Sequence, residues 1–270
     1  MSFQAKESYN ISDLVDIMRL LRAENGCPWD REQTHESIRR DLIEECYEVV
    51  EAIDADNPDM LCEELGDLLM QVVFHSRISE EQGRFDFDNV ADGICKKLIY
   101  RHPHVFADVI AETSEQVLEN WDELKKKEKG QTTAYQTLCS VPKVFPALMR
   151  SQKVQKRAGK VGFDYPDAEM ALADLKSEIS ELEDAISAKD DSNCFEELGD
   201  ILFSVVNVAR FLGIDAEDSL TASCDKFIAR FGDVERLAAE QGVDMKHASL
   251  DRLNELWRDA KSAQSKNKLK

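Results

Sequence analysis

A five-residue string occurs twice in this 270-residue chain and limits what the chain can fold into. Glu-Glu-Leu-Gly-Asp occupies residues 63–67 and returns unchanged at residues 196–200, an offset of 133. Acidic residues upstream of the string and apolar residues downstream of it repeat at the same offset. Two copies of one domain explain these matches. We therefore predict two domains, residues 1–133 and 134–270, joined through a polar, lysine-rich stretch.

The apolar residues of both copies follow the period of an α-helix rather than the alternation of a strand. In the first copy, Leu42 and Val49 mark one stripe, and the turn residues Asn57 and Pro58 separate it from the next. Ser12 is the expected N-cap of an earlier helix. Short turns between long amphipathic segments favour antiparallel neighbours. The sequence therefore predicts an all-α protein, a tandem repeat of two helical bundles.

The composition excludes several classes of partner. The chain has 34 basic and 54 acidic residues, a net charge of −20. A polymeric nucleic acid or an anionic membrane surface needs a basic face, so neither is expected to bind. The seven cysteines are odd in number and form no Cys-x-x-Cys motif, which argues against a disulfide framework. With no apolar run long enough for a membrane span, we expect a cytoplasmic protein.

Each copy carries a Glu-x-x-Glu pair on one predicted helix and a Glu-x-x-Asp pair on the next. A spacing of three places both acids of a pair on one helix face. An antiparallel hairpin can bring the two faces together, and a divalent cation would then relieve the repulsion between the carboxylates. Oxygen ligands alone favour Mg²⁺, with Mn²⁺ as a substitute. The predicted metal ligands are Glu45, Glu48, Glu64 and Asp67 in the first copy and Glu178, Glu181, Glu197 and Asp200 in the second.

Two other interpretations of these acids were weighed. Acidic pairs on a charged helix often do no more than face solvent, but identical spacing in two diverged copies favours metal binding. A di-iron carboxylate bundle needs two Glu-x-x-His units. The chain has one, at Glu32 and His35, which argues against di-iron. A Walker phosphate loop and a Gly-x-Ser-x-Gly elbow are absent from the sequence.

Basic and aromatic residues follow the acids in each copy. A Lys and an Arg four residues apart share one helix face, from which they can contact phosphate oxygens, and a later tryptophan can stack on a base. The alternatives are a solvated basic turn and a tryptophan in the core. His102 and His104 flank Pro103, where we expect a turn rather than a metal site. The candidate substrate-binding residues are Lys97, Arg101 and Trp121 in the first copy and Lys226, Arg230 and Trp257 in the second.

Several of these segments resemble the MazG family of nucleotide pyrophosphohydrolases. Residues 26–30 read Gly-Cys-Pro-Trp-Asp, and residues 33–35 read Gln-Thr-His. The resemblance runs from about residue 10 to residue 262. Further matching segments are 42–45, 102–106, 146–148, 152–158 and 161–164.

The resemblance implies an all-helical enzyme that uses Mg²⁺ to cleave nucleoside triphosphates between the α- and β-phosphates, giving a nucleoside monophosphate and pyrophosphate. It also implies a homodimer in which both partners complete each site. Family members with two copies often rely on the C-terminal one, so Glu178, Glu181, Glu197 and Asp200 are the predicted catalytic residues.

The second copy departs from the family pattern at three positions. Ser177 stands where the first copy has Glu44, and Asp174 and Asn193 replace lysines near the triphosphate. These replacements weaken the expected hold on the phosphates. The alternative function is a non-catalytic nucleotide sensor or a helical assembly module.

Overall fold

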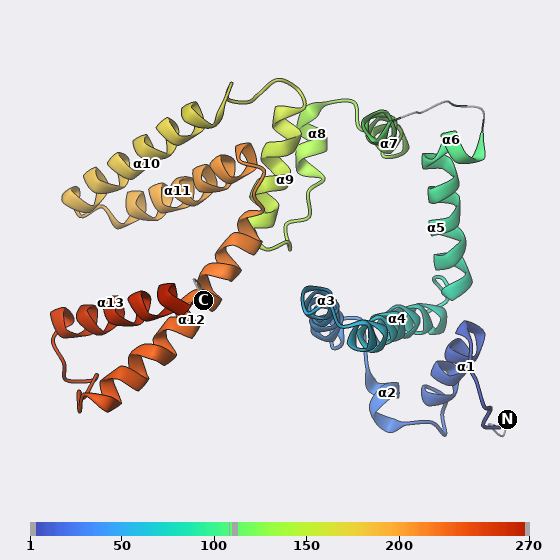
Figure 1. Cartoon of the computed structure of the whole chain (residues 1–270). Helices are drawn as coiled ribbons and strands as arrows, with labels where there is room; N and C mark the ends of the chain where they lie inside the picture. The colour runs from blue at the N-terminus through green and yellow to red at the C-terminus, as the bar shows by residue number, and fades with distance from the viewer. Residues whose placement is uncertain (1–3, 108, 110–112, 268–270) are drawn as a thin grey trace. The chain divides into compact units, whose positions relative to one another are not determined.

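The computed structural model describes residues 4–107, 109 and 113–267, and within this part of the chain it contains helices and no strand (Figure 1). The prediction of an all-α protein is confirmed. The helices are α1 (Ile11–Leu21), α2 (Pro28–Glu32), α3 (Arg39–Asp54), α4 (Pro58–Glu81), α5 (Phe87–Arg101), α6 (Pro103–Phe106), α7 (Ser114–Glu128), α8 (Ala134–Cys139), α9 (Ala147–Gly159), α10 (Ala168–Ala188), α11 (Asp191–Phe211), α12 (Ala216–Glu240) and α13 (Leu250–Asn267).

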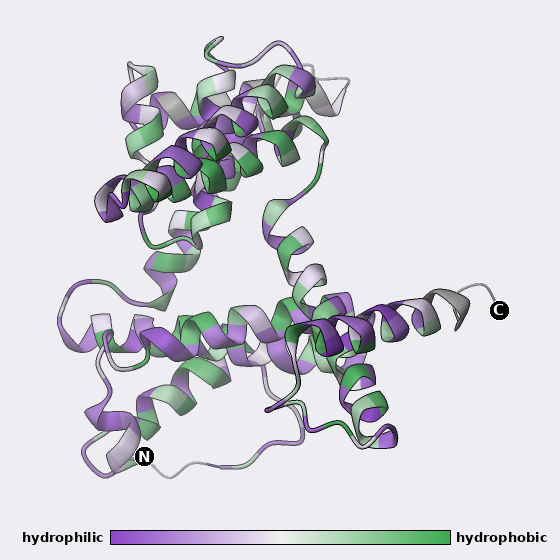
Figure 2. Ribbon diagram, turned by 90° about the vertical axis from the view of Figure 1, so that its left-hand side faces the viewer, coloured by the Kyte–Doolittle hydropathy of each residue, from purple (hydrophilic) through white to green (hydrophobic). Residues whose placement is uncertain are grey.

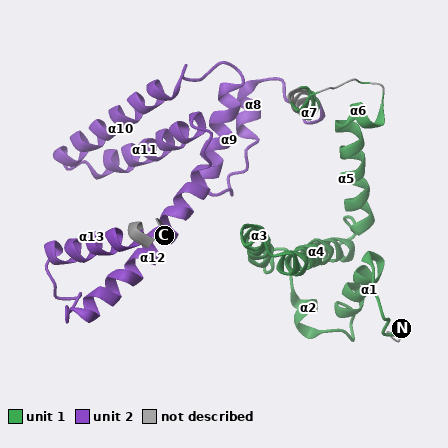
Figure 3. Ribbon diagram, viewed as in Figure 1, with its two compact units in different colours: residues 1–125 green, residues 126–270 purple. Residues whose placement is uncertain are grey.

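The chain divides into two compact units, residues 1–125 and residues 126–270 (Figure 3). Each unit is built around an antiparallel hairpin of two long helices, α3 with α4 in the first and α10 with α11 in the second. A further helix packs on the second helix of each hairpin: α1 on α4, and α9 on α11. The division falls within α7, and the domain boundary after residue 133 stays a prediction.

The hairpin turns of the two units have the same backbone conformation. Asp56 and Lys189, which are 133 residues apart, both have a positive φ, 49° and 56°. The residue after each of them, Asn57 or Asp190, caps the next helix by accepting a hydrogen bond from the backbone N–H three residues on. The repeated turn fixes the direction in which the second helix leaves, and so sets which residues face each other across the hairpin.

The first helix begins two residues earlier than the sequence suggested. Asn10 is its N-cap, and its side chain accepts hydrogen bonds from the backbone N–H groups of Ser12 and Asp13. The side chain of Asp13 in turn accepts a hydrogen bond from the backbone N–H of Asn10, which completes a capping box. The prediction of Ser12 as the cap is therefore wrong. The turn expected at Pro103 is present, since α5 ends at Arg101 and Pro103 begins α6.

Each unit has its own buried apolar cluster. In the first unit, side chains from α1 and α4 meet next to the start of α3; the buried members are Met18, Ile38, Val73, Phe74 and Ile78. In the second unit the cluster lies between α12 and α13 and consists of Val234, Ala238, Leu256 and Ala260.

Much of the apolar stripe on each hairpin remains exposed. Ile53 and Leu65 are 56% and 48% exposed in the first unit, and Ile186 and Leu198 are 60% and 51% exposed in the second. Figure 2 shows hydrophobic and hydrophilic residues interspersed along the helices of both units, as expected of amphipathic helices. Among the described residues, none of the helices has the length and apolarity needed to cross a bilayer.

Candidate metal centre

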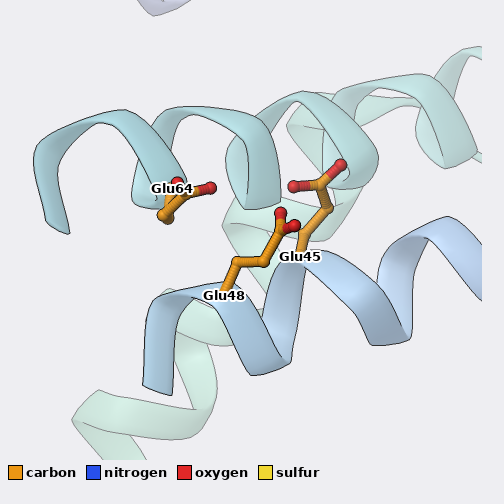
Figure 4. Close-up of side chains that lie close together, drawn as sticks. All are labelled: Glu45, Glu48 and Glu64. Atoms are coloured by element: carbon orange, nitrogen blue, oxygen red, sulfur yellow. The ribbon is translucent and has the colours of Figure 1, made fainter. Parts of the chain in front are cut away.

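Three carboxylates of the first unit converge between α3 and α4. Glu45 and Glu48 lie one turn apart on α3, and Glu64 reaches toward them from α4 (Figure 4). One oxygen of each side chain lies within 4.8 Å of one oxygen of the other two. All three side chains are partly buried. The arrangement follows from the i, i+3 spacing, which places Glu45 and Glu48 on the side of α3 that faces α4.

The second unit contains a corresponding group. Glu178 from α10 and Glu197 and Asp200 from α11 also each place one oxygen within 4.8 Å of the others. Glu197 is 9% exposed, which is low for a glutamate without a basic partner. Two hairpins in one chain thus each present a three-carboxylate group of the kind that holds a divalent cation.

Four metal ligands were predicted in each unit, and the one that lies outside the three-carboxylate group differs between the units. In the first unit Asp67 is outside the three-carboxylate group, and in the second unit Glu181 is outside it. The hydroxyl of Ser177 donates a hydrogen bond of 3.2 Å to Glu181 on the same helix. This bond holds the Glu181 carboxylate along α10. Ser177 stands at the position that Glu44 occupies in the first copy. Both outlying acids still act electrostatically on their groups.

Crowding raises the pKa of acids in both groups. Loss of hydration, followed by the charges of Asp67 and Glu48, raises the pKa of Glu45 above its ordinary value. Loss of hydration and the charges of Glu48 and Glu63 raise the pKa of Glu64. In both residues, therefore, loss of hydration is the largest cause of the raised pKa, and the neighbouring negative charges add to it.

The second unit shows the same effect. Loss of hydration raises the pKa of Glu178, and the charges of Glu181 and Asp174 add to the increase. The pKa of Glu197 is raised by loss of hydration and then by the charges of Glu181 and Asp200. Asp174 therefore contributes to the electrostatics of the group, although the sequence marked it only as a departure from the family pattern.

Sequence reasoning missed a polar residue next to the first group. The buried Gln71, one turn after Asp67 on α4, forms a side-chain hydrogen bond with Glu45 that lowers the pKa of Glu45 and partly offsets the increase. Its Oε1 atom is buried without a hydrogen-bond partner among the described residues. The available signal was a glutamine inside an otherwise apolar stretch of α4.

His35 forms a partly buried pair with His75 rather than a metal site with Glu32. The Nδ1 atoms of the two rings are 2.8 Å apart, and the rings stack with centroids 5.1 Å apart. The Nε2 atom of His35 also lies 3.2 Å from the Ser79 hydroxyl. Burial lowers the pKa of His75, and the neighbouring His35 adds to this effect. Among the described residues, neither histidine belongs to a group suited to hold a metal.

The candidate substrate-binding residues of the second unit lie on the α12–α13 hairpin. The guanidinium carbon of Arg230 is 5.0 Å from the centre of the Trp257 ring, and the Phe227 ring is 5.1 Å from it. Trp257 also packs against the apolar cluster between these helices. Lys226 is exposed. These side chains lie on a different hairpin from the carboxylates of α10 and α11, so their substrate roles stay predictions.

The candidate residues of the first unit lie on α5 and α7 rather than on the carboxylate hairpin. Arg101 is 9% exposed at the end of α5, and Lys97, one turn earlier, is exposed. The Trp121 ring lies 6.0 Å from the ring of His102, so it contacts the turn that follows α5. Their substrate roles remain predictions too.

Comparison with known proteins places this architecture in a family. The model of the MazG nucleotide pyrophosphohydrolase domain matches residues 33–106 and 167–234, which span the two carboxylate hairpins. The match covers both units and more than half of the chain. The chain therefore belongs to the MazG nucleotide pyrophosphohydrolase domain family.

Curated relatives extend the match over nearly the whole chain. The nucleoside triphosphate pyrophosphohydrolase of Escherichia coli K12 is 44% identical over 93% of this chain and 97% of its own length. The nucleoside triphosphate pyrophosphohydrolase/pyrophosphatase MazG of Thermotoga maritima is 43% identical over 92% of this chain and 94% of its own. An uncharacterised Bacillus subtilis protein, YabN, is 45% identical over 96% of this chain and 53% of its own length.

The raised pKa values predict an unusual pH dependence for the metal-free protein. A carboxyl group whose pKa is raised in the folded state binds its proton more tightly there than in the unfolded chain, where its pKa is about 4.5. It therefore stabilises the fold at a pH below 4.5, and this contribution is lost as the pH rises through the pKa of the folded state. We expect the melting temperature in chelator to fall between pH 4.5 and pH 7. Added Mg²⁺ should restore it near pH 7, because ligand binding stabilises the folded state.

A matched pair of variants isolates this effect from the large net charge. The double variant Glu64→Gln/Glu197→Gln should flatten the decrease in melting temperature. Glu63→Gln/Glu196→Gln removes the same charge from exposed neighbours and should keep most of the decrease. If the melting temperature decreases equally with pH in the two double variants, the carboxylate groups are not the cause of the decrease.

Proposed function

We propose that the protein is a Mg²⁺-dependent pyrophosphohydrolase that converts nucleoside triphosphates to nucleoside monophosphates and pyrophosphate. The observation that carries the proposal is the pair of three-carboxylate groups, each with raised pKa values, in a chain of the MazG family. Relatives that match nearly end to end bear the name nucleoside triphosphate pyrophosphohydrolase. We also propose that this reaction serves nucleotide-pool housecleaning.

The residues present fit a hard divalent cation. Every donor in the two groups is a carboxylate oxygen, and these oxygens suit Mg²⁺ or Mn²⁺ better than softer metals. Glu178, Glu197 and Asp200 would hold the ion in the second unit, with Glu181 joining them on a change of rotamer. When bound, such an ion supplies positive charge to phosphate oxygens and acidity to a nearby water.

The chain's own groups would then act on the α-phosphate. Carboxylates of the group would orient the attacking water, and a carboxylate of the group that is not bound to the ion would accept its proton. Lys226 and Arg230 are the proposed phosphate contacts and Trp257 the proposed stacking residue. Because α12 and α13 carry these three away from the carboxylates of their own unit, they would serve a site completed on dimerisation.

A homodimer is the proposed assembly. Besides Ile186 and Leu198, Ile179 and Leu202 of the same hairpin are 43% and 50% exposed. A stripe of large apolar side chains along two adjacent helices costs stability in water and is suited to cover by another copy. The proposed compartment is the cytoplasm, because all seven cysteines are free thiols.

Product analysis tests the reaction. With Mg²⁺, the protein should convert ATP, GTP, CTP or UTP to the monophosphate and pyrophosphate, as measured by anion-exchange chromatography. EDTA should abolish turnover, and Mg²⁺ or Mn²⁺ should restore it. A diphosphate with orthophosphate would place attack at the wrong phosphorus. Specific nucleotide binding without turnover would favour a non-catalytic sensor instead.

Two nearly isosteric variants identify the active copy. Glu197→Gln should lower kcat on the order of 10²-fold or more, because it removes a ligand charge from the second unit. Glu64→Gln, the same change in the first unit, should have little effect. Glu196→Gln and Glu63→Gln are the controls. Loss of activity in Glu64→Gln alone would assign catalysis to the first unit, and half the rate in each variant would assign it to both.

Light scattering tests the assembly. At micromolar concentration we expect a mass of at least twice the 30.7 kDa of one chain. Replacing the exposed Leu202 by Glu should shift the protein toward the monomer, because it places a charge in the apolar stripe. Ser180→Glu, an exposed polar position on α10, is the control. A wild-type monomer that turns over substrate would contradict the dimeric site.

A further inference from the structure

The second unit contains a small basic pocket that the carboxylate chemistry does not use. It has a volume of about 190 Å³ and lies where the segment before α8 meets the end of α9, and these two helices lie side by side (Figure 1). Its charged lining residues are Arg157 and Lys160, and the described part of the lining contains no acid. Hydroxyl and amide groups supply most of the remaining wall: Gln131, Thr132, Thr133 and Thr137. In a chain with a net charge of −20, such a pocket is suited to a negatively charged ligand.

The guanidinium of Arg157 is held in place by neutral oxygens. Its Nη1 atom donates to the backbone carbonyl of Thr137 and, over 2.8 Å, to the hydroxyl of Ser140. Both bonds use the same one of the three guanidinium nitrogens. The side chain is partly buried, and these two oxygens are its hydrogen-bond partners among the described residues. A partly buried cation with neutral partners lacks a counter-charge, which a bound anion would supply.

Two other arginines of low exposure each bond a carboxylate. Arg22 has a comparable place in the first unit, one residue after α1, and its Nη1 atom also donates to two backbone carbonyls. Its Nη2 atom, however, lies 2.8 Å from Oε2 of Glu81. In the second unit, Nη1 of Arg210 lies 2.9 Å from Oδ2 of Asp164. Among the described residues, Arg157 has no such acid, so the pocket keeps its positive charge.

Two further groups provide donors to the pocket. Lys160 follows Arg157 by three residues at the end of α9, a spacing that places both side chains on one face of the helix. The Thr133 hydroxyl oxygen accepts a hydrogen bond of 3.2 Å from the backbone N–H of Gln136. Because that oxygen already accepts, its hydrogen is the atom that it can offer to a ligand. Cationic and hydroxyl donors around one space are the groups that bind phosphate oxygens.

The size and the lining of the pocket favour a small inorganic anion over a nucleotide. A volume of about 190 Å³ is below the ~300 Å³ at which pockets for drug-sized organic ligands begin. The described lining residues include no aromatic ring, so a base would have no surface on which to stack. The lining residues lie on α8, α9 and the segments beside them, whereas the acids of the metal group lie on α10 and α11. The two sites therefore share no side chain.

We propose that this pocket binds a phosphate oxyanion, either inorganic phosphate or pyrophosphate, between the Arg157 guanidinium, the Lys160 ammonium and the Thr133 hydroxyl. Pyrophosphate should bind more tightly than phosphate, because it carries more negative charge toward the same two cations. Pyrophosphate is also the product of the proposed reaction, so a chain with this pocket would bind its own product. That link to the reaction rests on the proposed function, whereas the binding site itself does not.

Isothermal titration calorimetry of the whole chain tests the pocket. Phosphate and pyrophosphate are titrated separately, in chelator and at constant ionic strength, so that no metal takes part. Lys160→Gln and Arg157→Gln each remove one cation of the pocket. Lys156→Gln, the matched control, removes the same charge from an exposed position of α9 outside the lining. The double variant Lys226→Gln/Arg230→Gln removes the proposed phosphate contacts of α12 and so separates the two sites.

Lys160→Gln should weaken pyrophosphate binding roughly 5-fold, as expected for one exposed ionic contact. Arg157→Gln should weaken it on the order of 10-fold or more, because it removes charged hydrogen bonds. Lys156→Gln and the α12 double variant should keep the wild-type affinity. Circular dichroism must show unchanged helicity, and if Arg157→Gln fails to fold, Lys160→Gln decides.

Three results would overturn the pocket: no binding by the wild type, equal affinity in the wild type and the folded pocket variants, or loss of binding in the α12 double variant alone. Each of these leaves hydrolysis of triphosphates unaffected as a separate question. Pyrophosphate binding that is weakened by Lys160→Gln, in a protein that hydrolyses no triphosphate, would uphold the pocket and reject the proposed function.

Discussion

Electrostatic repulsion across the helix hairpin is the constraint on which the rest of the structure depends. In each unit, two helices meet along a line that carries three acids with oxygens no more than 4.8 Å apart. Apolar packing along the hairpin must hold these acids together, because they oppose it. A divalent cation at these acids, as proposed, would replace the repulsion between them by attraction to a shared ion.

The two units differ in what packs against the shared hairpin. In the first unit, Phe74 of α4 packs beneath Arg22 and belongs to the apolar cluster of α1 and α4, next to a stacked pair of histidines. In the second unit, Asn207 stands at the position that corresponds to Phe74, and the apolar cluster lies elsewhere, between α12 and α13. The same hairpin is therefore packed against different surroundings in the two units.

The fold was accessible from the sequence because it rests on local periodicity and on a literal repeat. The 133-residue offset located both hairpins, and the Glu-x-x-Glu spacing identified acids that do converge, Glu45 with Glu48 among them. What the sequence could not provide was side-chain direction. Whether Glu181 turns toward α11 or toward Ser177 depends on one rotamer. The unpaired Oε1 atom of Gln71 was equally inaccessible, since an unpaired amide can be recognised only when its neighbours in the fold are known.

The left-handed residue in each hairpin turn, Asp56 or Lys189, restricts how the two copies can diverge. A β-branched residue at either position would hold a positive φ only with strain, whereas glycine would adopt it freely. This residue helps to set the direction in which the second helix of the hairpin leaves the turn. The convergence of the carboxylates therefore depends on the backbone of a turn residue that is not itself one of the acids.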